Sequence, residues 1–177
     1  MNPKAGFFFD RDGVVNMDPH PEPYVLSWQQ WRWQPEIHEL LQVVKDRGFA
    51  TILVTSQRGV GKRLMSQEDL DAIHERMQSE LGDLAFDAIH ACTGTPESPF
   101  PAKPDPAMVL AGLETLDLDR AQSWLIGDAD RDIAMGRKAG LSTLVRVRGL
   151  KDIGIEADIT IDRIGELTEF LDVSASR

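Results

Sequence analysis

The sequence predicts an α/β protein, a Rossmann-like three-layer sandwich with a central, mainly parallel sheet. Two observations predict this class. Short apolar runs alternate along the whole chain with segments of helical periodicity. Several of the runs carry β-branched residues, which is typical of strands buried on both faces. With 177 residues, and with neither internal repeats nor a linker, the chain is expected to form a single domain over 1–177 with its core at about 5–172.

The strands are expected where the apolar runs lie. These runs are 5–9, 50–54, 86–91, 124–127, 142–147 and 157–161. Helical patterns fill the intervals, and their ends are recognisable. Pro35 suits a first helical position, Ser66 and Asp69 form the pattern of a capping box, and Gly140 is typical of a helix end. The expected helices are 35–47, 66–81, 106–116, 131–139 and 164–171, and the tail 173–177 is expected to fray.

Charge and composition exclude several classes of function. Lysine and arginine number 19 against 29 aspartates and glutamates, which gives a net charge of −10 and disfavours binding to nucleic acid or to an anionic membrane. No apolar run is long enough for a membrane span, and the first apolar stretch is too short for a secretory signal. Cys92 is the single cysteine, so no internal disulfide framework is possible. We therefore expect a cytoplasmic protein, and an anionic substrate would need a local cation.

Carboxylates and hydroxyls follow three of the predicted strands. The residues at these positions are Asp10, Asp12 and Gly13 after the first strand, Thr55, Ser56, Gln57 and Arg58 after the second, and Asp128 and Asp132 after the fourth. Because ligands of such sheets bind outside the carboxyl ends of the strands, these side chains are expected to converge. Several aspartates buried together need a cation, and Mg²⁺ suits a shell of carboxylates and water.

Each group also has an ordinary structural interpretation. Asp10 and Asp12 can supply a nucleophile and a proton-transfer group, but an Asp-x-Asp-Gly sequence is equally a surface turn. The hydroxyl of Thr55 can hold phosphoryl oxygens or simply end a strand. Lys103 lies in a stiff segment between prolines that can direct its ammonium group, although a lone lysine is usually exposed. Asp128 and Asp132 can bind metal, and aspartates at such positions also cap helices.

Two familiar motifs do not fit. A calcium-binding loop beginning at Asp10 would need glycine and glutamate where Val15 and Pro21 stand. A nucleotide-binding P-loop ending at Lys62 would need serine or threonine at Arg63.

The order of the remaining motifs resembles the haloacid dehalogenase superfamily of phosphohydrolases. The motifs are Asp10-Arg11-Asp12-Gly13, Val54-Thr55-Ser56-Gln57, Lys103-Pro104-Asp105-Pro106 and Gly127-Asp128 with Asp132. The resemblance covers about 7–147, and its details are similar to the branch that holds histidinol-phosphate and heptose 1,7-bisphosphate phosphatases. It implies a small phosphorylated metabolite as substrate, in carbohydrate metabolism or histidine biosynthesis. The intervals between the motifs leave no room for a large cap domain, and either a monomer or a homodimer is expected.

The resemblance also implies roles for individual residues. Asp10 would attack phosphorus to form an aspartyl-phosphate, and Asp12 would protonate the leaving alcohol and then activate water. Thr55 would bind the transferring group, and Lys103 would offset its charge. Mg²⁺ would be held by Asp10, by the backbone carbonyl of Asp12 and by Asp128, with Asp132 one shell further out. Residues 56–58 (Ser56, Gln57 and Arg58) are expected to contact the substrate.

The chain departs from that branch at two places. The branch commonly carries a zinc loop before the lysine motif, but here the cysteines it needs are absent apart from Cys92, so we expect no structural zinc. Basic residues often flank the motif lysine and the acidic motif, where Ala102 and Ala129 stand instead. A bisphosphate substrate is therefore in question.

Alternatives to a phosphatase remain at this point. A phosphotransferase or dehalogenase on the same scaffold is one, although a dehalogenase would not need Asp12. A non-catalytic or receiver-type module is another, but a receiver keeps its acceptor at the third strand and not the first. Arg58, Lys62 and Arg63 are candidate anion contacts or plain surface charge. The tryptophans at 28, 31 and 33 line the entrance or pack beneath a flap.

Overall fold

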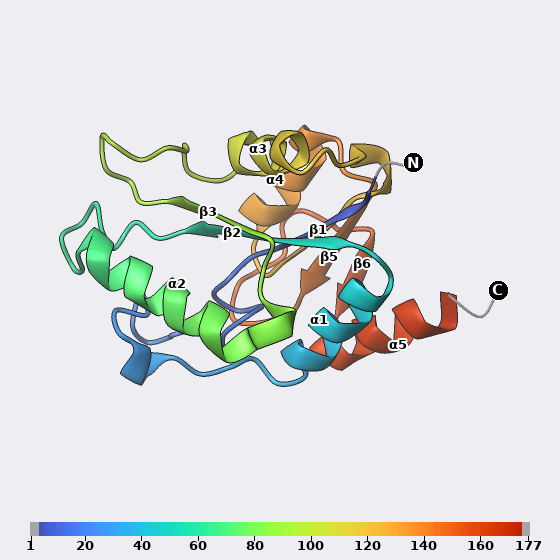
Figure 1. Cartoon of the computed structure of the whole chain (residues 1–177), viewed down its shortest axis with the longest axis horizontal. Helices are drawn as coiled ribbons and strands as arrows, with labels where there is room; N and C mark the ends of the chain where they lie inside the picture. Colours follow the sequence, from blue (N-terminus) through green and yellow to red (C-terminus); the bar gives the residue numbers. More distant parts are fainter. Residues whose placement is uncertain (1–3, 175–177) are drawn as a thin grey trace.

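Six strands form one open parallel sheet in the computed structural model, which describes residues 4–174 (Figure 1). The strands are β1 (Gly6–Phe9), β2 (Ala50–Ser56), β3 (Ala88–Cys92), β4 (Trp124–Gly127), β5 (Thr143–Val147) and β6 (Ile159–Ile161). They lie in the order β3-β2-β1-β4-β5-β6, and every pair of neighbours is parallel. The predicted fold class is confirmed, and each predicted apolar run overlaps its strand.

Helices cover both faces of this sheet. They are α1 (Ile37–Asp46), α2 (Gln67–Leu81), α3 (Ala107–Thr115), α4 (Asp130–Ala139) and α5 (Ile164–Ser174), with short 3-10 turns η1 (Trp28–Gln30), η2 (Gly82–Leu84) and η3 (Arg120–Gln122). In Figure 1, α3 and α4 lie on one side of the sheet, and α1, α2 and α5 lie on the other. Within residues 4–174 none of the connections between strands forms a second domain.

Strand β1 shows how the sheet separates two apolar cores. Phe7 and Phe9 pack into the core beneath α1, α2 and α5, whereas Phe8 packs into the core beneath α3 and α4. All three side chains are fully buried. Alternate residues of a strand point to opposite faces, so three consecutive phenylalanines stabilise both layers at once. This places the end of β1 rigidly at the centre of the molecule.

Helix ends agree with the sequence patterns except at α1. Ser66 and Asp69 form the predicted capping box, and Gly140 ends α4 with φ of 77°. Pro35, however, is not the first helical residue, because α1 begins at Ile37 after Glu36, whose φ is 66°. The carboxylate of Glu36 instead accepts hydrogen bonds from the chain that opens α5, so a contact distant in sequence overrides the local signal.

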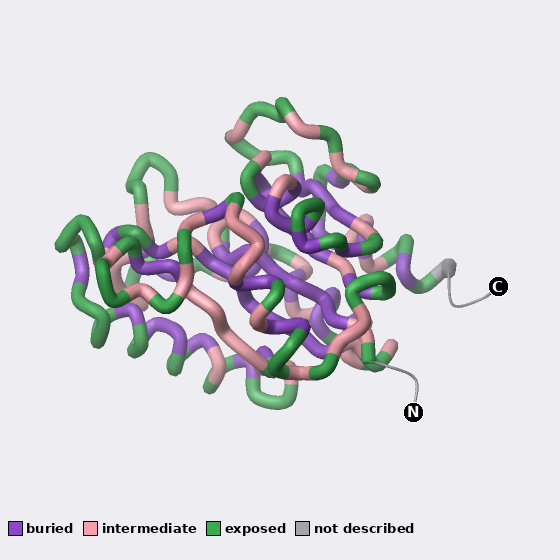
Figure 2. Tube along the Cα trace, turned by 90° about the horizontal axis from the view of Figure 1, so that it is seen from above, coloured by how far each residue is buried: buried purple, intermediate pink, exposed green. Residues whose placement is uncertain are grey.

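The remaining expectations about the ends and the surface can be placed briefly. Residues 175–177 of the tail that we expected to fray lie outside the described residues, and α5 includes Ser174. No helix within residues 4–174 combines the length and the apolar character needed to cross a bilayer. Figure 2 shows the buried segments running through the interior, with exposed segments on the outer helix faces and loops.

Candidate active site

The carboxyl ends of the three central strands bring the predicted site residues together. Because β1 lies between β2 and β4, the segments that leave these strands meet at one edge of the sheet. Asp10 follows β1, Thr55 lies near the end of β2, and Asp128 follows β4. All three residues are buried. Fixed backbone positions and little exposure give these polar groups a defined geometry.

Lys103 lies between two carboxylates at this edge. Its Nζ donates hydrogen bonds to Oδ1 of Asp10 at 2.6 Å and to Oδ1 of Asp132 at 2.7 Å. Burial alone would lower the pKa of Lys103, but the charges of the two carboxylates outweigh burial and raise it. The side chain is therefore a buried ammonium group. It is the local cation that an anionic substrate needs in a chain with a net charge of −10.

Asp10 has an unusual environment for a carboxyl group. Its Oδ1 accepts the Lys103 hydrogen bond and a second one from the backbone N–H of Arg11 at 2.8 Å. Burial, together with the negative charges of Asp132 and Asp128, raises the pKa of Asp10 to about 8, although Lys103 opposes that shift. A buried carboxyl group with so large a shift marks a candidate functional site, and a further cation nearby would return it to the charged form.

Three carboxylates form a cluster that fits a divalent cation. One oxygen each from Asp10, Asp128 and Asp132 lies within 4.8 Å of the others. Oδ1 of Asp128 is buried and has no hydrogen-bond partner, so a cation would satisfy this acceptor. Both oxygens of Asp132 are already engaged, by Lys103 and by the backbone N–H of Ala129 at 3.0 Å. A donor set made of oxygen alone suits Mg²⁺ better than a softer metal.

Two glycines make room for these carboxylates. A Cβ atom at Gly13 would lie 2.2 Å from Oδ2 of Asp128, and one at Gly127 would lie 2.3 Å from Cβ of Asp132. Both distances are well below van der Waals contact. Gly13 also has φ of +89°, a conformation that residues with a side chain rarely adopt. The backbone can therefore approach the carboxylates this closely only where no side chain is present.

Asp12 lies beside Asp10 but belongs to a different network. Its Oδ1 accepts hydrogen bonds from Arg11 and from Asn16 Nδ2 at 2.9 Å, and its Oδ2 accepts one from Gln57 Nε2 at 3.0 Å. Burial would raise the pKa of Asp12, but the charge of Arg11 and these hydrogen bonds outweigh burial and hold it below its usual value. The side chain is still 19% exposed, so solvent reaches this carboxylate.

The residues at the end of β2 and directly after it divide into two groups. Thr55 and Gln57 are buried, and the hydroxyl oxygen of Thr55 accepts a hydrogen bond from Gln57 Nε2 at 2.8 Å. Ser56 is partly buried, and its hydroxyl group has no hydrogen-bond partner. Arg58 is exposed and packs against Gly94. Of the three predicted substrate contacts, Ser56 alone lines the hollow that opens at Asp12.

This hollow is small and contains charges of both signs. Its volume is about 240 Å³. Its lining includes the acidic residues Asp12, Asp18 and Glu22 together with the basic residues Arg131 and Lys151. An incoming ester would meet Asp12 and two cations among the lining residues. The hollow therefore has the polarity needed for a small polar anion.

Comparisons with known proteins decide the family. A family model described as HAD-hydrolase-like matches residues 101–162, which include Lys103, Asp128 and Asp132. The D-glycero-alpha-D-manno-heptose-1,7-bisphosphate 7-phosphatase of Burkholderia mallei is 32% identical over 151 residues, which are 79% of this chain and 78% of that protein. The chain belongs to the haloacid dehalogenase superfamily of phosphatases.

Two other similarities extend over most of the chain. The D-glycero-beta-D-manno-heptose-1,7-bisphosphate 7-phosphatase of Rhodopseudomonas palustris is 28% identical over 167 residues, which are 89% of this chain and 88% of that protein. The crystal structure of D,D-heptose 1,7-bisphosphate phosphatase from B. bronchiseptica, complexed with magnesium and phosphate, matches with a TM-score of 0.83 at 26% identity. That match covers 96% of this chain and 99% of the other. The sheet and its helices are those of the superfamily.

Lys151 contacts the candidate site, and the sequence motifs did not identify it. Its Nζ lies 2.5 Å from Oδ2 of Asp128 and 3.4 Å from Oδ2 of Asp18. The residue lies in the loop between β5 and β6, beyond the last recognised motif. That loop leaves the carboxyl end of β5. The rule that ligands bind outside the carboxyl ends of the strands therefore applied to this loop as well. A basic residue after β5 was therefore a usable signal.

The loop that carries Lys151 is fixed by a buried arginine. Arg146 is fully buried on β5, and its guanidinium group donates to Oδ1 of Asp130 at 2.8 Å and to the backbone oxygen of Asp152 at 2.9 Å. Asp130 also accepts hydrogen bonds from the backbone N–H groups of Gly154 and Ile155. These contacts tie the loop between β5 and β6 to the start of α4.

The tryptophans pack together and do not line the hollow at Asp12. The rings of Trp28 and Trp31 stack with centroids 5.0 Å apart, and Trp33 contacts both of them edge-on. Trp31 is buried, and Arg11 lies over its ring. The sequence left two roles open for these residues, and the structure supports packing within the 18–34 segment.

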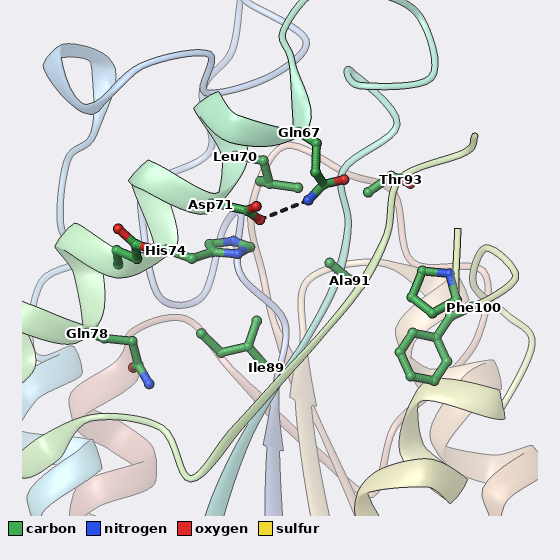
Figure 3. Close-up of a pocket in the computed structure, with 11 residues that line it drawn as sticks. Gln67, Leu70, Asp71, His74, Gln78, Ile89, Ala91, Thr93 and Phe100 are labelled. Atoms are coloured by element: carbon green, nitrogen blue, oxygen red, sulfur yellow. Dashed lines mark hydrogen bonds between the residues drawn. The ribbon is translucent and has the colours of Figure 1, made fainter. Parts of the chain in front are cut away.

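A larger hollow lies elsewhere, between α2 and the edge strand β3 (Figure 3). Its volume is about 650 Å³, and none of the predicted catalytic residues lines it. Its wall includes His74, whose Nε2 lies 3.2 Å from Arg11 Nη1. Size alone would select this hollow, but the predicted catalytic residue Asp12 lines the smaller one. The chemistry of the lining therefore decides which hollow is the site.

The loop before Lys103 is held by contacts that need no metal. The ring of His90 stacks on Phe100 with centroids 5.0 Å apart, and its Nδ1 lies 2.8 Å from the backbone oxygen of Met108. Ser98 bonds through its hydroxyl to the backbone of Thr93 and of Phe100. The absence of structural zinc stays a prediction, and these contacts are what orders the loop in its place.

Proposed function

We propose that the protein is a magnesium-dependent phosphomonoesterase that acts on small sugar phosphates through an aspartyl-phosphate intermediate. The observation that carries this proposal is the Lys103 ammonium group, buried between Asp10 and Asp132 beside the unsatisfied oxygen of Asp128. A cation and a metal-binding cluster around one carboxylate are what phosphoryl transfer requires, because this reaction depends on positioning and on charge offset.

Each group at the site has a defined task in this reaction. An oxygen of Asp10 attacks phosphorus, and the bond to the ester oxygen breaks. Asp12, an ionised carboxylate at rest, takes a proton from solvent in the hollow and gives it to that leaving oxygen. It afterwards takes a proton from the water that cleaves the aspartyl-phosphate. Lys103 and the hydroxyl group of Thr55 bind the oxygens of the transferring group. The two hydrogen bonds to Oδ1 of Asp10 hold its carboxylate in one orientation.

The metal would be held by Asp10, Asp128 and the backbone carbonyl of Asp12, and Asp132 would act through Lys103. When bound, Mg²⁺ offsets the negative charge of the carboxylates and of the phosphoryl oxygens. The fit of the site to this ion rests on its oxygen donors and on the free Oδ1 of Asp128.

The substrate class follows from the relatives and from the hollow at Asp12. The relatives described above are named for a heptose bisphosphate, and the hollow presents Arg131 and Lys151 to an incoming molecule. These cations stand in the wall although Ala102 and Ala129 occupy the positions that are often basic in the branch. We therefore propose sugar phosphates as substrates, with a second phosphate bound at the basic side of the hollow.

The test is release of inorganic phosphate from a panel of sugar mono- and bisphosphates, histidinol phosphate and p-nitrophenyl phosphate. Activity is expected with Mg²⁺ and not in the presence of a chelator. Asp10→Asn should lose at least 10³-fold in kcat, roughly the effect of removing a nucleophile. Asp83→Asn is the matched control, because Asp83 is exposed on η2. Phosphate release that survives in Asp10→Asn, or that ignores the chelator, would contradict the proposal.

A further inference from the structure

The carboxylate of Asp12 is held by two fully buried polar side chains, Arg11 and Gln57. Arg11 Nη2 lies 3.1 Å from Oδ1 of Asp12 and 2.9 Å from Oε1 of Gln57. A buried guanidinium group is costly unless its donors are used, and here they are directed at neighbouring acceptors. The two side chains and the carboxylate therefore form one connected unit, which solvent reaches at the exposed side of Asp12.

The orientation of the Gln57 amide follows from this arrangement. A guanidinium group can only donate hydrogen bonds, so the amide atom that faces Arg11 must be the oxygen. Nε2 then points the other way, where it donates to Oδ2 of Asp12 at 3.0 Å and to the hydroxyl oxygen of Thr55 at 2.8 Å. Gln57 thus joins the proton-transfer carboxylate to the residue that contacts the phosphoryl group.

Arg11 is itself fixed on its far side. Its Nη1 lies 3.2 Å from Nε2 of His74, and the same donor-only argument makes that nitrogen an acceptor. Burial and the charge of Arg11 lower the pKa of His74 to about 3, so the ring stays neutral and keeps this acceptor. The ring of Trp31 lies 5.6 Å from the guanidinium carbon. Contacts from α2 and from the 18–34 segment therefore hold Arg11 in one place.

We infer that Gln57 and Arg11 are positioning residues for proton transfer by Asp12, a role that rests on the function proposed above. Hydrogen bonds to both oxygens fix the rotation of the Asp12 carboxyl group while its exposed side lines the hollow. As the Asp10 oxygen bonds to phosphorus and the ester bond breaks, the Asp12 proton moves to the departing oxygen. Rotation of Asp12 away from that line would leave an alkoxide as the leaving group.

Leaving-group dependence separates this role from a general structural one. An alkyl alcohol needs a proton as it leaves, whereas p-nitrophenolate leaves readily without one. The value of kcat/KM covers only the steps up to departure of the alcohol, so later hydrolysis does not mask the difference. Gln57→Met should lower kcat/KM for a sugar phosphate by roughly 10²-fold, the usual size of an acid–base contribution, and for p-nitrophenyl phosphate by less than about threefold.

Two further variants sharpen the experiment. Gln57→Glu keeps the shape and the acceptor for Arg11 but removes both donors from Nε2, so it should fold and show the same split between the two substrates. Gln42→Met makes the same change on α1, where Gln42 Nε2 bonds Asp46 at 2.8 Å, and should leave both activities unchanged. Thermal unfolding of each variant gives an independent measure of folding.

The outcomes are distinct. A selective loss on the sugar phosphate supports the positioning role. An equal loss on both substrates, or no loss, in either variant that remains folded overturns it while the phosphatase assignment stands. A wild-type protein that releases phosphate from neither ester contradicts the proposed function itself, which is a different result.

Discussion

Two fully buried arginines, Arg11 and Arg146, anchor different parts of the same edge of the sheet. Arg11 bonds only to side chains, and one of its partners is the carboxylate of Asp12. Arg146 bonds to Asp130 and to a backbone oxygen of the loop that carries Lys151, and its Nε has no partner. The first arginine fixes the carboxylate of Asp12, the proposed proton-transfer group, and the second fixes the loop that carries Lys151.

The partners also differ in their access to water. The side chain of Asp130 is 38% exposed, whereas Gln57 is fully buried and His74 nearly so. If Arg146 is removed, water can solvate Asp130. If Arg11 is removed, Gln57 and His74 have no such replacement. The guanidinium group is therefore expected to contribute more to stability at position 11 than at position 146. The two groups are also expected to affect different kinetic constants.

The largest effect is expected from Arg11→Met. Loss of the guanidinium group removes the charge that offsets the Asp12 carboxylate and leaves the Gln57 oxygen without its buried donor, which should lower the free energy of unfolding by about 3–5 kcal/mol. The kcat/KM for a sugar phosphate should fall roughly 10²-fold. Urea denaturation and steady-state assays measure the two effects. A loss smaller than that of Arg146→Met in both measurements would contradict the comparison.

Arg146→Met should have a moderate effect of another kind. Water can take over the contact to Asp130, so the expected cost is about 1–3 kcal/mol, that of a broken hydrogen-bonded group. The loosened loop should raise KM for a sugar bisphosphate several-fold with little change in kcat. Lys151→Met should reproduce the rise in KM without the loss of stability, and Lys138→Met, on the exposed end of α4, is its control. A fall in kcat alone would argue against this division of roles.

The smallest effect, taken per pH unit, concerns pH and sharpens the Arg11 side of the comparison. The pKa of His74 is lowered from 6.5 to about 3 by burial and by Arg11, so between those values the unfolded chain binds a proton that the folded protein does not. Stability that depends on neutral His74 is therefore lost as the pH falls through this window, by about 1.4 kcal/mol per pH unit. Because the pKa of Asp10 is raised, Asp10 makes the stability of the folded protein increase as the pH falls, which is the opposite dependence.

The readout for His74 is the difference between His74→Gln and the wild type, which share Asp10. In denaturant unfolding from pH 6.5 to pH 4, the variant should lose less stability than the wild type on acidification. His20→Gln, in an exposed segment, should follow the wild-type curve. Parallel curves for His74→Gln and the wild type would mean that His74 is already protonated in the folded protein.

The sequence was sufficient for the fold and for the residues that follow strands. Asp10, Thr55 and Asp128 were predictable together because parallel strands end at one edge, so position along the chain gives position in space. Lys103 follows no strand directly, and its charge-offsetting role at the site was inferred from the family resemblance. The structure adds the two distances that make it a bridge.

Other features depend on contacts that no local pattern encodes. Gln57 was expected to contact the substrate, but its amide partners come from the loop after β1, and only the folded sheet brings them within reach. The start of α1 was misplaced because Glu36 bonds to the chain at the beginning of α5. Lys151 was missed because the recognised motifs end before its loop. The loop nevertheless follows the carboxyl end of β5, where ligands of such sheets bind.

The closeness of Gly13 and Gly127 to the carboxylates has a consequence for how this enzyme can fail. Neither residue carries a group that reacts, yet an added methyl at either one would overlap Asp128 or Asp132. A single alanine mutation would then displace an acidic side chain that is itself unaltered. Inactive natural variants can thus arise at positions that a survey of reactive residues would pass over, with every acid, base and cation still encoded.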